Sequence, residues 1–481
     1  MRVLIAPHVF TRAAAAPASK SHTIRRLMMA ALTGGVSTVE YPLDSLDAQS
    51  CAAACRVLGA AITEERDPGG RLCRWTVRGQ RPDPRPGADQ EASPPPEGAA
   101  PSGAARERLI HAGNSGTTLF FAIAAAALGR EPVTFTGDAQ IARRGAGPLL
   151  DALAGLGVST LSSPGPREEG GCVPITVRGP WRGGRVSVSC PTSQYLSALL
   201  LAAPLAPAGT ITEIGVPLLN ERPYVEMTLS YLKAQGLWGG GGTPGVEFTP
   251  DFSWFRAAGG ASYTPMNGPV PGDFSSAAFP AAAAAISGGT AALLGLDPED
   301  IQGDKVFFDY LAHMGCDVRW ERLAPVSSPG DKAAWRVTVS RTGPLRGGTF
   351  DLNAAPDLLP VMAVLGAFAQ GKTVLTNAAH ARIKETDRVA VMAGELGKLG
   401  VRREERPGGL VIHGPRRGDG GNPRAGAIKG GERLDGRGDH RVVMALACAA
   451  LGADRPVEID GAEAVDVSYP GFWDLLGTAE R

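Results

Sequence analysis

LAHMGCDV (residues 311–318) joins the end of an amphipathic helix to the start of an apolar strand through Gly315. Related phrases recur along the chain as CRVLGAAI (55–62), LAGLGVST (153–160), LKAQGLW (232–238) and LGKLGVRR (396–403). Glycine is the usual residue after a helix that ends in the left-handed conformation, so a single phrase is weak evidence. Five phrases whose glycines are separated by 98, 79, 79 and 85 residues indicate an internal repeat.

Each repeat has room for two helices and several strands. In the second repeat, helix-type sequences at 116–129 and 147–157 flank the strand-type sequence VTFTG (133–137). The fourth and fifth repeats carry the same pair of helices, at 275–289 with 304–315 and at 358–371 with 388–400. We predict a βαβαββ unit that buries its Ala-rich first helix, because alanine favours helix and allows close packing. FWDLLG (472–477) begins a sixth copy.

Length and composition limit the remaining possibilities. A chain of 481 residues exceeds one ordinary core, which predicts two domains. The net charge is zero, so no overall field attracts nucleic acid, and no apolar run reaches the length of a membrane span. MRVLIAPHVF (1–10) predicts a strand and not a signal peptide. The Pro/Gly-rich segment at about 79–105 explains the longer first interval and predicts a disordered loop, with a proline-motif ligand as the alternative.

Seven cysteines are scattered along the chain. Cys51 and Cys55 are four residues apart and share a helix face, but no second Cys or His pair completes a zinc site. Buried free thiols in a reducing cytoplasm are the expected state, and we expect no metal.

Polar motifs interrupt the apolar background, and most of them precede or open a predicted helix. The densest is HARIKETDR (380–388), which is either a solvated helix face or a site for an anion and acid–base chemistry. Helix N-termini attract anions, and lysine and arginine add counter-charges for phosphate and carboxylate groups. Each motif alone is also explained by helix capping. The full set is SKSHTIRR (19–26), GNSGTT (113–118), TGDAQIARR (136–144), PTSQY (191–195), RPYVEMT (222–228), KETDR (384–388) and GDHR (438–441).

Taken in order, these motifs resemble those of the 5-enolpyruvylshikimate-3-phosphate (EPSP) synthase family, within the enolpyruvyl transferase superfamily. The resemblance covers nearly the whole chain apart from the proline-rich insert, and KETDR followed by DHR is its most specific part. It implies an α/β (α+β) fold with two domains, each an inside-out α/β barrel of three βαβαββ units around a pseudo-threefold axis. Residues 1–18 and 272–481 would form one domain, and 19–271 the inserted domain.

The resemblance also implies a reaction without metal or organic cofactor. The family transfers the enolpyruvyl group of phosphoenolpyruvate to the 5-hydroxyl of shikimate 3-phosphate by addition and elimination, and releases phosphate. We therefore expect two small-molecule substrates, phosphoenolpyruvate and a phosphorylated hydroxyl acceptor. Nucleic acid and membrane are not expected partners, and we expect a cytoplasmic monomer.

The motif matches imply a role for each site residue. Those for phosphoenolpyruvate are Lys20, Arg144 and Gln194 at its phosphate, Arg388 and Arg441 at its carboxylate, and Gly116, which leaves room for its approach. Those for the acceptor are Ser21, Arg25, Thr192, Ser193, Gln194, Tyr224, Asp357 and Lys384. The catalytic set is Lys20, Asp357 at the acceptor hydroxyl, Glu385 as proton donor and His440 near the leaving phosphate. A carboxyl that donates a proton at neutral pH needs a raised pKa.

Three positions depart from the family pattern. Phe120 stands where the family usually has Arg, Glu221 where Ser commonly helps to bind the acceptor phosphate, and Val467 where a Lys lies near phosphoenolpyruvate. Glu221 would repel the acceptor phosphate unless it points away. The alternatives are an enolpyruvyl transferase of specialised metabolism acting on UMP or another polyol, and a non-catalytic binder of phosphorylated metabolites.

Overall fold

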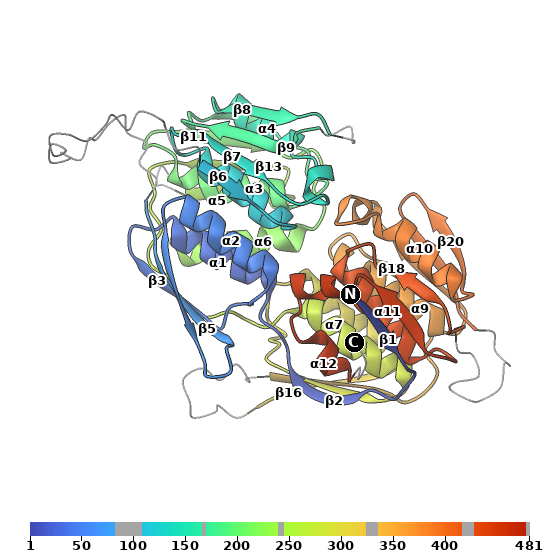
Figure 1. Ribbon diagram of the computed structural model, residues 1–481. Helices are drawn as coiled ribbons and strands as arrows, with labels where there is room; N and C mark the ends of the chain where they lie inside the picture. The colour runs from blue at the N-terminus through green and yellow to red at the C-terminus, as the bar shows by residue number, and fades with distance from the viewer. Residues whose placement is uncertain (82–107, 166–169, 239–244, 324–334, 416–427, 478–481) are drawn as a thin grey trace.

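The hydrophobic core of the protein divides into two clusters. The structure, a computed structural model, describes residues 1–81, 108–165, 170–238, 245–323, 335–415 and 428–477. One cluster is built from buried side chains between Ala18 and Val270 and the other from Val3–Phe10 together with Phe274–Leu476. They form the upper and lower bodies in Figure 1, and both chain termini lie in the lower body. From residue 82 on, the loop predicted at about 79–105 lies outside the described residues.

A βαβαββ unit in the upper body shows the pattern that the whole fold repeats. Its elements are β6 (Arg108–His111), α3 (Gly116–Ala126), β7 (Val133–Thr136), α4 (Gly147–Gly155), β8 (Ser159–Ser163) and β9 (Cys172–Arg178). The sheet order is β6-β7-β9-β8, with β6 parallel to β7 and β9 antiparallel to both of its neighbours. The parallel pair requires a crossover, and α3 provides it.

Two further units have the same order and continuous chain. The upper body contains β10 (Gly184–Ser187), α5 (Gln194–Ala202), β11 (Ile211–Gly215), α6 (Arg222–Ala234), β12 (Gly245–Phe248) and β13 (Trp254–Ala258). The lower body contains β18 (Thr349–Asp351), α9 (Leu359–Phe368), β19 (Lys372–Thr376), α10 (Arg388–Lys398), β20 (Arg402–Arg406) and β21 (Gly409–His413).

Two units obtain their first strand from a distant part of the chain. The upper one joins β14 (Asn267–Pro269) to α1 (Lys20–Ala31), β3 (Val36–Glu40), α2 (Leu46–Val57), β4 (Ala61–Arg66) and β5 (Leu72–Arg78). The lower one joins β2 (Thr11–Ala15) to α7 (Phe274–Ser287), β15 (Thr290–Leu294), α8 (Val306–His313), β16 (Cys316–Arg322) and β17 (Trp335–Arg341). The two connecting segments lie side by side, through a bridge between Ala18 and Gly272.

The sixth unit is closed by the N-terminus of the chain. It consists of β22 (Arg433–Asp435), α11 (His440–Leu451), β23 (Val457–Asp460) and α12 (Phe472–Leu476), and β1 (Arg2–Ile5) pairs antiparallel with β23. The strand predicted at the N-terminus is thus confirmed over residues 2–5. FWDLLG is α12 and the glycine after it, the last helix of this unit, so the expectation that it begins a sixth copy is wrong.

The repeated glycines end the second helix of each unit. Gly59 and Gly315 have φ of 110° and 96°, in the region that favours glycine, and the corresponding glycines 157, 236, 400 and 477 have positive φ as well. A side chain at any of them would strain the turn into the following segment, which explains the repeated phrase.

The first helix of each unit is almost entirely buried. In the lower body α7, α9 and α11 pack against one another, and every residue of α11 is buried. In the upper body α3 packs against α1 and α5 in the same way. Each of these helices begins at the side of its body that faces the other body, so their N-termini approach a common region. Within the described ranges, no helix is both long and apolar enough to cross a membrane.

This packing predicts a contrast between two identical substitutions. Leu365→Ala, in fully buried α9, should lower the free energy of unfolding by about 2–5 kcal/mol because it leaves a cavity between helices. Leu161→Ala, on β8 with 73% of the residue exposed, should change it by less than about 0.5 kcal/mol. Urea unfolding followed by circular dichroism measures both, and equal losses would contradict the burial of α9.

Candidate active site

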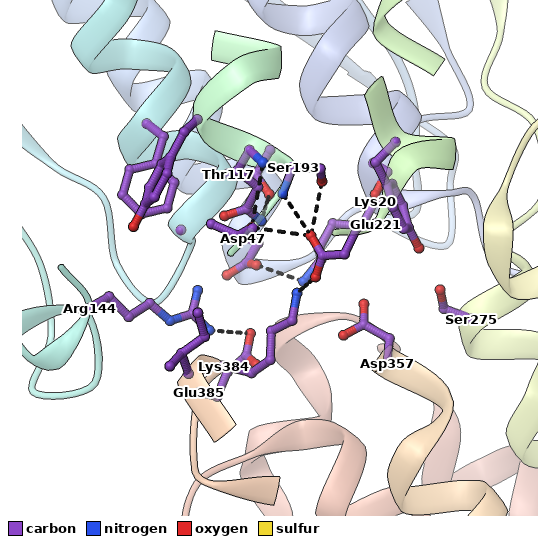
Figure 2. Close-up of a pocket in the computed structure, with 18 of the residues that line it drawn as sticks. Lys20, Asp47, Thr117, Arg144, Ser193, Glu221, Ser275, Asp357, Lys384 and Glu385 are labelled. Carbon is purple, nitrogen blue, oxygen red and sulfur yellow. Dashed lines mark hydrogen bonds and ion pairs between the residues drawn. The ribbon is translucent and has the colours of Figure 1, made fainter. Parts of the chain in front are cut away.

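The sequence motifs meet in a pocket between the two bodies. Its empty volume is about 1030 Å³, and side chains from both bodies line it. Figure 2 shows Lys384 and Glu385 of the lower body extending toward Glu221 and Arg144 of the upper body. A cavity that two bodies share changes when they move relative to each other, so this geometry suits a site that encloses its ligands.

Helix N-termini supply most of the lining, and the polar motifs cap these helices. Ser19, Ser115 and Asp273 accept hydrogen bonds from the first turns of α1, α3 and α7, and Asp439 accepts from two N–H groups of α11. Helix capping by these residues is therefore compatible with the anion-site interpretation. Caps satisfy part of each helix end, while the helix dipoles still favour negative charge in the pocket.

The charged groups of the described lining balance in number. Five cations face the pocket, namely Lys20, Arg25, Arg144, Lys384 and Arg441, and so do five carboxylates, Asp47, Glu221, Asp273, Asp357 and Glu385. Burying unpaired charge is costly, and the protein limits this cost by pairing most of these cations with its own carboxylates. An anionic ligand must take over some of these pairs.

Arg388 is the centre of a buried ionic network. Its Nη1 lies 2.7 Å from Asp357 Oδ1, its Nη2 2.6 Å from Glu385 Oε2 and its Nε 2.8 Å from Asp439 Oδ2. The side chain is fully buried and lies behind the pocket lining. Arg441, which does line the pocket, reaches the other oxygen of Asp357 at 3.1 Å. Two arginines thus hold one carboxylate in a defined orientation.

Glu385 is shared between the two bodies. Its Oε1 lies 2.8 Å from Arg144 Nη2 of the upper body, while Oε2 contacts Arg388. Burial raises the pKa of Glu385, but Arg144 and Arg388 outweigh that effect and hold it well below its ordinary value. In the same way burial raises the pKa of Asp357, and Arg441 and Lys384 bring it far below the usual range. Both carboxyls are therefore ionised in the ligand-free protein, whereas a proton donor needs the opposite shift.

Lys20 and His440 lie close enough to Glu385 to affect its pKa. Lys20 Nζ is 3.1 Å from Asp47 Oδ2, in a pair that the sequence analysis did not anticipate. His440 is fully buried at the start of α11, outside the pocket lining, and its two ring nitrogens have no hydrogen-bond partner. Burial and the charge of Lys20 hold the pKa of His440 well below its ordinary value, so the imidazole is neutral at pH 7.

Gly116, Gln194 and Arg144 form one wall of the pocket. Gln194 donates a hydrogen bond from Nε2 to Thr117 Oγ1 at 2.9 Å. A Cβ atom on Gly116 would lie 2.4 Å from Arg144 Nη1 and 3.2 Å from Gln194 Oε1. The Arg144 guanidinium can therefore occupy its position only because residue 116 has no side chain.

The opposite wall contains buried polar groups around Arg25. Its guanidinium donates to Thr228 Oγ1 at 3.0 Å and to the carbonyl oxygens of Ser21 and Tyr224. Burial lowers the pKa of Arg25 to about 10, which leaves it charged at neutral pH. The Tyr224 hydroxyl donates to Asp304 Oδ2 at 3.2 Å, and the Ser275 hydroxyl donates to the same oxygen.

Glu221 points into the pocket. Its carboxylate pairs with Lys384 and accepts hydrogen bonds from Thr192 and Ser193. The other two departures from the family pattern, Phe120 and Val467, make no such charged contact. Phe120 lines the pocket and packs edge-on against Tyr195 with ring centroids 5.0 Å apart. Val467 is buried at the end of the short helix η6 (Ala462–Val467) and does not line the pocket.

The structure brings thirteen of the sequence-predicted residues into the pocket lining. They are Lys20, Ser21, Arg25, Gly116, Arg144, Thr192, Ser193, Gln194, Tyr224, Asp357, Lys384, Glu385 and Arg441. Arg388 and His440 lie behind it. Lining residues that the sequence analysis did not single out include Asp47, Thr117, Asp273 and Ser275. Each lies within the first turn or at the cap of a helix, and that position is the signal that would have found them.

Comparison with known proteins finds relatives over nearly the whole chain. The sequence profile of the EPSP synthase (3-phosphoshikimate 1-carboxyvinyltransferase) family matches residues 11–83 and 93–476. The 3-phosphoshikimate 1-carboxyvinyltransferase of Acetivibrio thermocellus is 42% identical over 460 residues, which cover 96% of this chain and 94% of that protein. That of Halobacterium salinarum is 38% identical over 482 residues, with 99% and 98% covered.

Solved structures agree with these relatives. An EPSP synthase from Acinetobacter baumannii superimposes with a TM-score of 0.73 at 26% identity, covering 100% of this chain and 98% of that chain. The enolpyruvyl transferase NikO from Streptomyces tendae superimposes with a TM-score of 0.68 over the same shares at 17% identity, a likeness of fold alone. The predicted two-domain α/β fold class is confirmed.

The Asp304 carboxyl predicts a pH effect on stability. Burial, followed by the charge of Asp357, raises its pKa to about 7. The folded protein therefore holds this proton more tightly than the unfolded chain, where the pKa is about 4. The stabilising contribution is complete below that value and is lost as the pH rises through about 7.

Asp304→Asn removes this contribution. Relative to wild type, the variant should become more stable as the pH rises from 5 to 8, which thermal unfolding at the two pH values measures. A stability difference that is the same at both pH values would contradict the raised pKa.

Proposed function

The chain belongs to the EPSP synthase family, and from this premise we propose that it transfers the enolpyruvyl group of phosphoenolpyruvate to the 5-hydroxyl of shikimate 3-phosphate. The observation that carries the proposal is the pocket between the bodies, where the family motifs bring five cations together beside converging helix N-termini. UMP, another polyol or mere binding is not favoured, since the relatives are named for transfer to 3-phosphoshikimate.

Phosphoenolpyruvate occupies the side of the pocket between Arg144 and Arg441. Lys20, Arg144 and Gln194 receive its phosphate, and Gly116 allows this because it leaves space around the Arg144 guanidinium. The carboxylate binds Arg441 directly, and Arg388 contributes an N–H from behind as the ligand takes over one of its carboxylate contacts. Paired guanidinium groups suit a carboxylate because they donate two parallel hydrogen bonds.

The acceptor lies on the other side, against the upper body and Lys384. Ser21, Arg25 and Tyr224 line the region where its ring and hydroxyls bind. Thr192, Ser193 and Lys384 surround the position proposed for its phosphate. This arrangement directs the 5-hydroxyl toward Asp357, which is ionised and held by Arg388 and Arg441.

Two carboxyls move the protons. In the addition step the 5-hydroxyl loses its proton to Asp357 while its oxygen bonds to C2 of phosphoenolpyruvate, and Glu385 gives a proton to the methylene carbon. In the elimination step a proton returns from the new methyl group to Glu385, and the bond from C2 to the phosphate oxygen breaks. Lys20 stabilises the departing phosphate, and neutral His440 can donate a hydrogen bond to it after a small shift.

Ligand binding itself can raise the pKa of Glu385, as a proton donor requires. The phosphate of phosphoenolpyruvate competes for Arg144, the cation that does most to hold down the pKa of Glu385. Losing that partner, and gaining an anion as neighbour, raises the pKa of a buried carboxyl. Glu385 thus becomes a proton donor when phosphoenolpyruvate arrives.

Both bodies of one chain line the pocket, which supports action as a monomer on small-molecule substrates. Six of the seven cysteines are buried thiols, which supports a reducing compartment such as the cytoplasm.

The proposed function predicts turnover that depends on Glu385. With phosphoenolpyruvate and shikimate 3-phosphate, the protein should release phosphate and form an enolpyruvyl product. Glu385→Gln should lower kcat by about 10²–10⁴-fold, because it removes the transferable proton. Glu395→Gln, on the same α10 helix and outside the pocket, serves as the control and should retain turnover. Absence of turnover in wild type would contradict the proposed function.

Gly116→Ala should weaken binding of phosphoenolpyruvate without removing the acid–base groups. The new methyl group would displace the Arg144 guanidinium, so KM for phosphoenolpyruvate should rise by at least about 10-fold, a loss near 1.4 kcal/mol. Gly129→Ala is the control, since its Cβ meets only Ala126 O at 3.6 Å. A KM for phosphoenolpyruvate that stays at the wild-type value would show that Arg144 does not bind this substrate.

A further inference from the structure

Glu221 occupies a complete set of anion donors. Its Oε2 accepts hydrogen bonds from Ser193 Oγ at 2.9 Å, Ser193 N at 3.1 Å and Thr192 Oγ1 at 3.2 Å, while Oε1 pairs with Lys384 Nζ. The residue is 2% exposed, so these contacts replace its hydration. Two hydroxyls, a backbone N–H before a helix and an ammonium group are the donors that a phosphate monoester needs.

The backbone holds Glu221 in this position at some cost. Its φ is 57°, in the left-handed region that residues other than glycine rarely adopt, and it directly precedes α6. Its N–H donates to Asn353 O of the lower body at 3.2 Å. Strained backbone persists only where the surroundings determine it, and here the surroundings are the four donors and the neighbouring body.

The donors come from both bodies. Thr192 and Ser193 precede α5 in the upper body, whereas Lys384 comes from the lower body, just before α10. The Glu221 carboxylate therefore bridges the bodies as a bound phosphate would. Burial raises the pKa of Glu221, but Lys384 and His380 bring it below its ordinary value, so the bridge is charged at neutral pH.

We propose that Glu221 is a built-in competitor for the acceptor phosphate: its carboxylate holds the phosphate donors in the free protein and must leave them before a phosphorylated acceptor binds. This inference rests on the proposed function, which places the acceptor phosphate at Thr192, Ser193 and Lys384. Glu221 is then a specificity-determining residue, because its displacement weakens binding of acceptors that carry the phosphate and leaves binding of the unphosphorylated ring unaffected.

The test compares two ligands that differ only in the phosphate. Calorimetry at fixed ionic strength gives Kd for shikimate 3-phosphate and for shikimate, with wild type, Glu221→Gln and Glu221→Ser. Both variants should bind shikimate 3-phosphate at least about 10-fold more tightly, while Kd for shikimate stays within about twofold. Glu226→Gln, which removes the same charge from a partly exposed position of α6, should leave both constants unchanged.

Other outcomes overturn the proposal. If the variants bind shikimate 3-phosphate no more tightly than wild type, Glu221 does not compete with the phosphate. If binding of both ligands changes equally, Glu221 has only a structural role. Failure of the proposed function is recognised separately, as absence of wild-type turnover with phosphoenolpyruvate and shikimate 3-phosphate. In that case inorganic phosphate serves as the probe: tighter binding by Glu221→Gln that disappears in Glu221→Gln/Lys384→Met supports the competition, and unchanged binding overturns it.

Discussion

The architecture depends on one electrostatic constraint, the convergence of many helix N-termini on a single cavity. Inner helices of both bodies begin at the pocket. The positive ends of their dipoles add to the positive charge of the five lining cations. Such a cavity cannot remain without negative charge, because each buried cation needs a partner. The protein meets this need largely with its own carboxylates, and the pairs Arg144–Glu385 and Lys384–Glu221 join the two bodies. Some of the interactions that balance the charge of the site are therefore also contacts between the bodies.

In the proposed mechanism, Arg388 connects this charge balance to catalysis. It is too deeply buried to serve as a simple surface clamp, yet it contacts both carboxyls that the proposed mechanism uses, Asp357 and Glu385. A cation held between a base and an acid stabilises the anionic form of each, so protonation of one is felt by the other. The resting state favours two ionised carboxylates, which suits Asp357 as a base. In the proposed mechanism, Glu385 becomes a proton donor only when a ligand anion takes Arg144 from it.

The sequence predicted local structure well and long-range connections less well. The recurring glycines located the ends of the second helices, since a left-handed turn restricts the residue locally. In two units the first strand, β2 or β14, comes from a distant part of the chain, and no local sequence signal predicts this. The pairing of residues 11–15 with 290–294, for example, depends on the tertiary structure. The same limit applies to the site. Motifs identified the lining cations, but the burial of Arg388, the pairing of Lys20 with Asp47 and the raised pKa of Asp304 depend on packing between units.

The three departures from the family pattern show why position in space matters more than the change of residue type. Phe120 replaces a cation, but it joins Tyr195 in an aromatic pair, so the wall of the pocket stays packed and Arg144 and Lys20 remain as cations. Val467 is buried away from the lining, where a missing charge has no ligand to act on directly. Glu221 alone adds a charge among donors that both bodies contribute. Its carboxylate is stabilised by these donors, because it accepts their hydrogen bonds and pairs with Lys384. An added acid among these donors therefore acts against a ligand of like charge while stabilising the pocket without that ligand.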